Sequence, residues 1–137
     1  MSIQNIVGVA SSALSAQSLR ITLIAQNLAN ADSVTSPEGG PYQRRIPVFE
    51  ATPLQGDEGT EGTGVKVAAV LRDQTPPRVS YDPSNPLADA DGNVAQPSIN
   101  PVLEMVDMMQ ASRSYEANLS TLQTANNVAL KTLDLLK

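Results

Sequence analysis

The stretch that decides the fold is residues 3–31, IQNIVGVASSALSAQSLRITLIAQNLANA. Its apolar and small side chains recur at alternating spacings of four and three, which lines them up along one face of a helix. Residues 1–31 carry a single charged side chain, Arg20, and so lack the charged outer face of a solvated helix. We therefore expect neighbours on more than one side of this helix. The members of this N-terminal seam are Ile3, Val7, Ala10, Leu14, Gln17, Ile21, Ile24, Leu28 and Ala31.

The other end of the chain repeats the pattern and predicts a second helix, from about Val102 to Leu136. This helix would be about 50 Å long, beside an N-terminal helix of about 40 Å. Pro101 suits its first turn and Asn100 its N-cap. Asn126 either fixes the register of the helix pair or meets water at the edge of the seam. The members of this C-terminal seam are Met105, Met108, Ser112, Tyr115, Leu119, Leu122, Asn126, Ala129, Leu133 and Leu136.

Helix-breaking residues divide the chain into three parts. All ten prolines and seven of the eight glycines lie between residues 37 and 101. We therefore expect the N-terminal helix in residues 1–31, an irregular middle in residues 32–100 and the C-terminal helix in residues 101–137. The two helices should form the inner coiled-coil domain of the protein.

The middle contains three short runs with β propensity, which turn-forming residues separate. These runs are Ile46–Glu50, Val65–Leu71 and Arg78–Tyr81. Between the first two, at about residues 52–64, glycines and acidic residues predict a flexible acidic loop. The predicted fold is mainly α with a small β-containing middle: an elongated antiparallel coiled coil of N- and C-terminal helices plus an irregular and β insertion.

Composition excludes several functional classes. The chain has 14 acidic and 9 basic side chains, a net charge of -5, so nucleic acid is not an expected partner. The absence of cysteine and histidine removes thiolate nucleophiles and the usual zinc sites, and we expect no cofactor and no metal. Glu104 and Glu116 would lie about 18 Å apart on one helix, too far for the paired acids of a glycoside hydrolase. We therefore expect no enzymatic activity.

The beginning of the chain lacks the usual address signals. Its first cation is Arg20, so a cleaved secretory signal is not expected. Serines interrupt the apolar residues, and on that ground we expect no integral membrane span.

Two motifs in the middle resemble ligand loops but fail a test of their context. Aligned as a calcium loop, residues 89–93 would put Leu87 and Ser98 where acidic ligands belong, so we predict a turn. The glycines of residues 59–64 precede a predicted strand, whereas a phosphate-binding loop precedes a helix. We interpret them as a linker.

Tyr42, Arg44 and Arg45 form the most distinctive charged and aromatic cluster in the middle. Such a cluster can stack on bases and bind phosphate, or it can make ion pairs with a protein. Because the chain is acidic overall, we favour contact with a protein partner.

Several motifs together resemble the bacterial flagellar axial proteins. Ser12-Ala13-Leu14-Ser15-Ala16-Gln17 and Gln26-Asn27-Leu28-Ala29-Asn30-Ala31 are similar to the N-terminal signature of rod, hook and related subunits. A second set narrows the resemblance to the proximal-rod proteins of the flagellar basal body. It comprises the run from Ser36 to Arg45, Tyr81-Asp82-Pro83, Asp89-Ala90-Asp91-Gly92, Glu104-Met105-Val106-Asp107-Met108 and the run from Ala111 to Asn118.

The resemblance implies a structural subunit that assembles through its terminal helices into the helical drive shaft, which transmits torque from rotor to hook. It implies type III export without a cleaved signal peptide into the periplasm-spanning rod. The implied partners are other proximal- and distal-rod proteins, the junction protein between rod and export gate, and copies of the chain itself. Two alternatives come from other classes: a soluble helical secretion chaperone or adaptor that binds an exported flagellar client, and a carboxylate-dependent cell-wall hydrolase.

Overall fold

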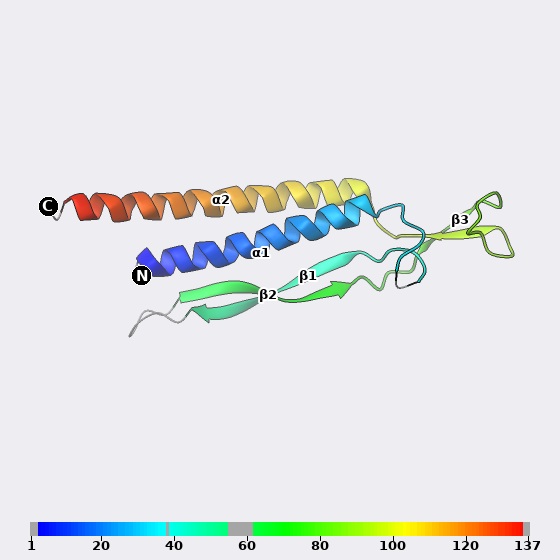
Figure 1. Cartoon of the computed structure of the whole chain (residues 1–137), viewed down its shortest axis with the longest axis horizontal. Helices are drawn as coiled ribbons and strands as arrows, with labels where there is room; N and C mark the ends of the chain where they lie inside the picture. Colours follow the sequence, from blue (N-terminus) through cyan, green and yellow to red (C-terminus); the bar gives the residue numbers. More distant parts are fainter. Residues whose placement is uncertain (1–2, 38, 55–61, 136–137) are drawn as a thin grey trace.

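The computed structural model describes residues 3–37, 39–54 and 62–135. Two long helices, α1 (Ile3–Ala29) and α2 (Pro101–Asp134), run antiparallel along the molecule (Figure 1). Four short strands lie between them in the sequence and form two hairpins. The predicted fold, two long terminal helices in contact and a small antiparallel β middle, is confirmed.

The start of α2 follows the local rules that the sequence indicates. Asn100 has an extended backbone, and its side-chain Oδ1 accepts hydrogen bonds from the amides of Val102 at 3.0 Å and Leu103 at 3.4 Å. Pro101 occupies the first turn, where no amide hydrogen is needed. The predicted N-cap is therefore confirmed, and it fixes the point at which the chain turns back along α1.

The first hairpin pairs β1 (Arg45–Leu54) with β2 (Gly62–Arg72) and lies along α1. Both strands extend into the region predicted as loop, because residues 52–54 pair with residues 62–64. Only residues 55–61 of the predicted acidic loop are left, and they lie outside the described residues. Gly64 has a packing role: a Cβ at this position would stand 2.7 Å from the Ser12 hydroxyl oxygen, so only glycine lets β2 approach α1 so closely.

The second hairpin pairs β3 (Arg78–Tyr81) with β4 (Asn93–Gln96) and projects from the end of the helix pair that is remote from both termini (Figure 1). β3 has the predicted bounds, whereas β4 is not among the predicted strands because only Val94 is apolar enough to mark it. The predicted turn before β4 is confirmed: the Asp89 carboxylate accepts hydrogen bonds from the amides of Asp91 and Asn93, and Gly92 has a φ of 79°.

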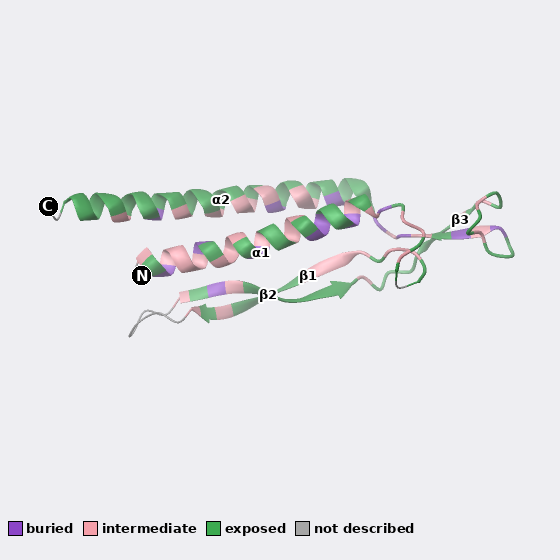
Figure 2. Cartoon of the chain, viewed as in Figure 1, coloured by how far each residue is buried: buried purple, intermediate pink, exposed green. Residues whose placement is uncertain are grey.

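The core is a thin layer centred on α1. Among the helices and strands of the described chain, α2 contacts only α1, whereas α1 also contacts β1 and β2. The expectation that the N-terminal helix has neighbours on more than one side is therefore met within one chain. Figure 2 shows buried residues concentrated along α1 and an α2 that is exposed over most of its surface. The buried apolar side chains are Ala10, Ala16, Leu23, Ile24, Ala31, Val94, Ile99, Ala111 and Ala125.

By length and composition alone, α1 is apolar enough to cross a membrane. The sequence-based expectation that its serines exclude a span therefore fails this test. One helix of this kind is weak evidence for a span, because core helices of water-soluble folds pass the same test. Here α1 packs between α2 and the β1–β2 hairpin.

Candidate functional site

The N-terminal seam lies in the middle layer of the molecule. Ile24 is buried, with an exposed fraction of 4%. The other seam residues singled out for assembly are half-buried, and none of them is fully exposed. They are Ile3, Val7, Leu14, Ile21 and Leu28. In the single chain, α2 and the β1–β2 hairpin thus cover much of this seam, and its role in assembly stays a prediction.

The C-terminal seam divides between two faces of α2. Met108, Tyr115, Leu122 and Ala129 are half-buried, as expected of residues beside α1. Of the alternate members, Met105, Leu119, Asn126 and Leu133 are exposed, whereas Ser112 is half-buried. Leu136 lies outside the described residues.

The residues that α2 buries stand one position before alternate members of this seam. They are Glu104, Ala111 and Ala125, in place of Met105, Ser112 and Asn126. The reason is that α2 has apolar residues on adjacent faces, and the spacing alone does not tell which face meets α1. Of the two alternatives for Asn126, the single chain places it on the exposed side.

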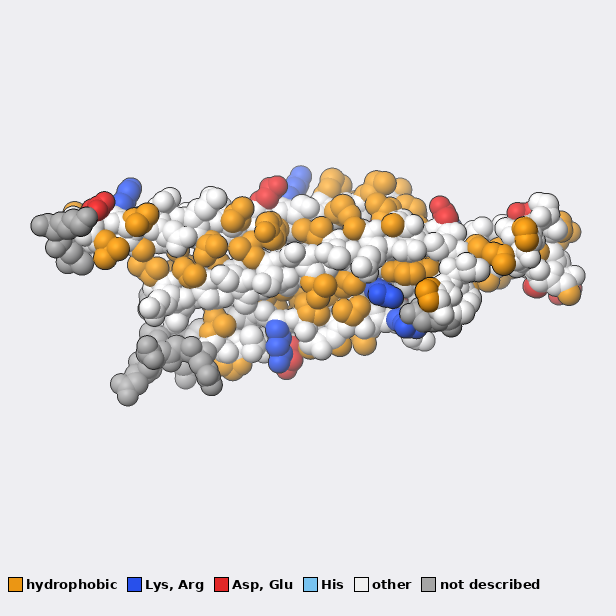
Figure 3. All heavy atoms as spheres, viewed as in Figure 1, with side chains coloured by type: hydrophobic (Ala, Val, Ile, Leu, Met, Phe, Trp, Pro, Cys, Tyr) orange, Lys and Arg blue, Asp and Glu red, His pale blue; other side chains and the backbone are white. Residues whose placement is uncertain are grey.

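An exposed apolar stripe therefore remains on α2, which we call the outer α2 stripe. Its members follow the same alternation of three and four, with polar residues at the intervening heptad positions. Figure 3 shows apolar side chains along α2 with few charged groups among them. The stripe consists of Val102, Met105, Met109, Leu119, Leu130 and Leu133, with exposed fractions of 66%, 51%, 56%, 37%, 61% and 59%.

The last turns of α2 extend past the start of α1 (Figure 1). Ile3 and Ile6 of α1 line a groove together with Ala125 and Val128 of α2, so these residues lie level with one another. Leu135, close to the end of α2, is 87% exposed. The end of the outer α2 stripe is therefore without an intramolecular neighbour on α1.

A polar cluster joins the other end of the helix pair to the first hairpin. Asn27 of α1 is 1% exposed. Its side-chain amide forms hydrogen bonds with both the backbone N–H and the backbone carbonyl of Arg45, the first residue of β1. The Arg45 amide donates to Asn27 Oδ1 at 2.8 Å, and Asn27 Nδ2 donates to the Arg45 carbonyl at 2.9 Å. Asn27 also accepts from the Tyr42 hydroxyl at 3.1 Å and donates to Glu104 Oε2 at 3.2 Å. One side chain therefore connects α1, β1 and α2.

Charged groups complete this cluster, which we call the polar joint and define as Arg20, Asn27, Tyr42, Arg44, Glu104 and Asp107. Glu104 is 1% exposed, and its Oε1 accepts a hydrogen bond from Arg44 Nε. Arg44 Nη2 pairs with Asp107 Oδ2 at 3.0 Å, and Arg20 Nη2 lies 3.8 Å from Asp107 Oδ1. Burial of Glu104 is tolerable because both of its oxygens have partners.

The three residues predicted to contact a protein partner are thus close together, at this joint. Arg44 is engaged inside the chain, and Tyr42 donates to Asn27. The Arg45 guanidinium lies 5.9 Å from the centre of the Tyr42 ring. Their contact with another protein stays a prediction, and the structure adds an intramolecular role for each.

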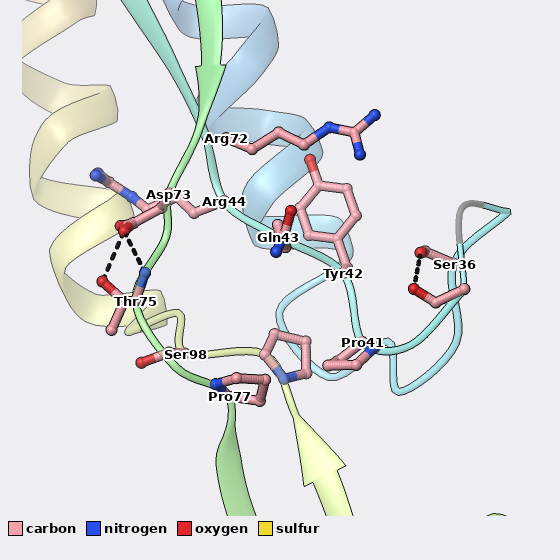
Figure 4. Close-up of a pocket in the computed structure, with 12 residues that line it drawn as sticks. Ser36, Pro41, Tyr42, Gln43, Arg44, Arg72, Asp73, Thr75, Pro77 and Ser98 are labelled. Carbon is pink, nitrogen blue, oxygen red and sulfur yellow. Dashed lines mark hydrogen bonds between the residues drawn. The ribbon is translucent and has the colours of Figure 1, made fainter.

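A cleft of about 270 Å³ opens beside the polar joint, where three connections of the chain meet. Figure 4 shows Tyr42, Arg72, Asp73 and Thr75 around it. Hydrogen bonds from the hydroxyl and the amide of Thr75 lower the pKa of the Asp73 carboxyl, and the nearby Arg44 adds to this effect. Asp73 is therefore held as an ionised loop acceptor.

Nothing in the described residues assembles a reactive centre. Glu104, one of the two carboxylates considered for hydrolysis, is buried and paired with Arg44. No group of three acidic, histidine or cysteine side chains in the described ranges is placed to hold a metal ion.

Sequence reasoning did not single out Asn27, Asp107 or Arg20 as site residues. Glu104 was considered as a hydrolytic acid and as part of a family motif but not as a site residue, because an acidic residue in the first turn of a helix is typical of a surface helix terminus. One signal was available. Asn27 stands in a helix with a single charged side chain, and a polar side chain that such a helix buries destabilises the fold unless it is hydrogen-bonded.

Comparison with known proteins gives one family throughout. A family model described as flagellar basal body rod FlgEFG protein, C-terminal, matches residues 90–135. The chain is 49% identical to the flagellar basal-body rod protein FlgC of Salmonella typhimurium over 135 residues, which cover 98% of each chain. It is equally similar to FlgC of Escherichia coli O157:H7, and 37% identical to FlgC of Borreliella burgdorferi over 96% of this chain and 95% of that one.

Matches of this identity over nearly the full length decide among the functional classes that the sequence leaves open. The chain is a structural protein of the flagellar basal-body rod, where it assembles with other rod proteins, and it is not an enzyme. The alternatives of a secretion chaperone and a cell-wall hydrolase are set aside on the same ground. The chain belongs to the FlgC family of flagellar basal-body rod proteins.

Proposed function

We propose that the chain is a proximal-rod subunit that joins its neighbours through the outer α2 stripe and so helps to transmit torque along the shaft. The observation that carries this proposal is the stripe itself, six large apolar side chains exposed on one face of α2. The proposed neighbours are other proximal- and distal-rod proteins, the junction protein between rod and export gate, and copies of the chain.

The exposed surface supports the same proposal. A globular monomer of 14.4 kDa exposes about 6,800 Å², whereas this chain exposes 9197 Å². The excess of about 2,400 Å² equals about three patches of the size that one partner contributes to a standard interface. A subunit with neighbours on several sides in a helical array would cover such an area.

Burial of the stripe can supply part of the free energy of association with neighbouring subunits. Covering the exposed part of each apolar side chain is worth about 1 kcal/mol, since about half of a typical 1.5–3 kcal/mol remains to be gained. Six such side chains then supply about 6 kcal/mol before the cost of association is subtracted. Interlocked side chains of this kind also resist sliding, which transmission of torque requires.

Cysteine scanning in assembled basal bodies tests the proposal. The chain has no cysteine, so single replacements at Met105, Met109 and Leu119 give a clean signal. We expect these thiols to react with a maleimide in the released subunit and to be protected, or crosslinked to a neighbouring rod subunit, in the assembled rod. Gln110, exposed on α2 but outside the stripe, provides the matched control position. Equal labelling of the stripe positions in both states would contradict the proposal.

A further inference from the structure

The apolar residues that α2 places beside α1 recur at heptad spacing, so by themselves they do little to fix how far one helix is shifted along the other. Among the described residues of α2, the only buried apolar side chains are Ala111 and Ala125. These two alanines are 14 residues, or two heptads, apart. A slip of whole heptads would therefore meet a similar surface of small and apolar side chains.

Asn27 and Glu104 break this repetition. The side-chain amide of Asn27 donates two hydrogen bonds and accepts two. Its four partner atoms lie in three segments of the chain. Glu104 has a partner on each carboxylate oxygen, Asn27 on one and Arg44 on the other. A slip of one heptad moves the helices by about 10 Å relative to each other and would leave buried polar groups without partners.

The alignment set at this point persists along the whole helix pair. Ile6 lies 21 residues before Asn27 on α1, and Ala125 lies 21 residues after Glu104 on α2. Ile6 and Ala125 line the same groove. The two contacts are therefore in one antiparallel register across three heptads, about 31 Å.

We propose that Asn27 and Glu104 are positioning residues that lock the register of α1 against α2 and, through Arg45, the place of the first hairpin. A single polar residue at a helix interface can specify register at some cost in stability. Here the lock acts within one subunit. It can therefore be tested independently of the proposed contacts between subunits at the outer α2 stripe. It also determines which segment of that stripe lies beyond the start of α1.

Disulfide reporters in the full chain test the lock. The variant Ile6→Cys/Ala125→Cys reports the observed register, whereas Ile6→Cys/Asn118→Cys and Ile6→Cys/Thr132→Cys report slips of one heptad in either direction. A disulfide needs Cα atoms about 5.5–6 Å apart, so each pair responds to one register. Without further changes we expect oxidation of the 6–125 pair and little of the other two.

Asn27→Leu, added to each reporter, should lower the ratio of native to slipped disulfide by about tenfold, because its four hydrogen bonds are lost. The matched control is Gln26→Leu, which places the same side chain at the exposed neighbouring position and should leave the ratio unchanged. Native crosslinking alone in Asn27→Leu, with unchanged helical circular dichroism, would overturn the proposal.

A second variant keeps the test decisive if Asn27→Leu loses its helical signal. Glu104→Gln preserves the size of the side chain, but it removes the charge that pairs with Arg44 and replaces one of the two acceptor oxygens with an amide donor. We expect it to remain helical and to show slipped disulfides at an intermediate level. If Glu104→Gln is helical and yields only the 6–125 disulfide, the lock does not reside in this cluster.

Discussion

The two long helices carry the same kind of sequence pattern and have opposite surroundings. α1 lies between α2 and the first hairpin, and none of its N-terminal seam is fully exposed. α2 touches only α1 among the described helices and strands, and four of the nine described residues of its predicted seam are exposed. The difference teaches that a heptad spacing identifies an apolar face but not the molecule that covers it.

The same comparison separates stability from assembly. Residues on α1 hold the single subunit together, whereas residues of the outer α2 stripe contribute little to its stability and would be covered by a neighbour in the proposed assembly. Substitutions on the two helices should therefore differ in what they damage, and the free energy of unfolding of the isolated subunit measures the difference.

The largest loss should follow Ile24→Asp on α1. Ile24 is 4% exposed, so the aspartate would bring a charge into the core and lose the apolar packing of the isoleucine. We expect the free energy of unfolding to fall by about 4 kcal/mol, measured by urea denaturation followed by circular dichroism. Thr22→Asp, an exposed position two residues away, is the control. Similar stability of the two variants would show that α1 is not the centre of the core.

Gly64→Ala should have a smaller effect at the contact of α1 with β2. The new methyl would meet Ser12 Oγ at 2.7 Å, and the overlap should lower the free energy of unfolding by about 1–3 kcal/mol. Ser12 also accepts a hydrogen bond from the Val65 amide at 3.1 Å, so removing its hydroxyl has a cost of its own. The double variant Ser12→Ala/Gly64→Ala should therefore lose less than the sum of the two single variants. Strict additivity in urea denaturation would place the hairpin further from α1.

Gln17→Met should raise stability slightly. The Oε1 atom of Gln17 is buried and has no hydrogen-bond partner among the described residues. Methionine has a similar length but no polar atom that loses its hydrogen bonds to water on burial. We therefore expect the free energy of unfolding to rise by about 1 kcal/mol. Gln26→Met, at an exposed position of the same helix, should change stability by much less. A loss of stability in Gln17→Met would mean that the amide has a partner in the isolated subunit.

The sequence was sufficient for the elements that local chemistry determines. Both helices, the cap at Asn100, the bounds of β3 and the turn before β4 follow from spacing, turn residues and capping groups. The strands β1 and β2 are longer than predicted because glycine was interpreted as a loop signal, whereas Gly64 serves close packing on α1. Its meaning depends on a contact 52 residues away in the sequence.

The polar joint was harder to predict for a related reason. Asn27, Arg44 and Glu104 come from three distant segments, and nothing local marks them as partners. The face of α2 that meets α1 was also undetermined, since two adjacent faces fit the same spacing. Both features depend on tertiary alignment, which periodicity in a single chain does not contain.

The smallest change in subunit stability should accompany Leu130→Asp, and this variant makes the comparison sharpest. Leu130 is 61% exposed, so the isolated subunit should unfold within about 0.5 kcal/mol of the unchanged protein. If the outer α2 stripe meets a neighbour as proposed, the same aspartate would be buried in the assembled rod, and its desolvation would cost several kcal/mol. We therefore expect normal urea denaturation together with loss of rod assembly and motility. Asn127→Asp introduces the same charge at an exposed polar position of α2 outside the stripe and should swim. Normal motility in Leu130→Asp would show that this part of α2 faces solvent in the rod as well. The difference in surroundings between α1 and α2 would then hold for the isolated subunit and not for its assembly.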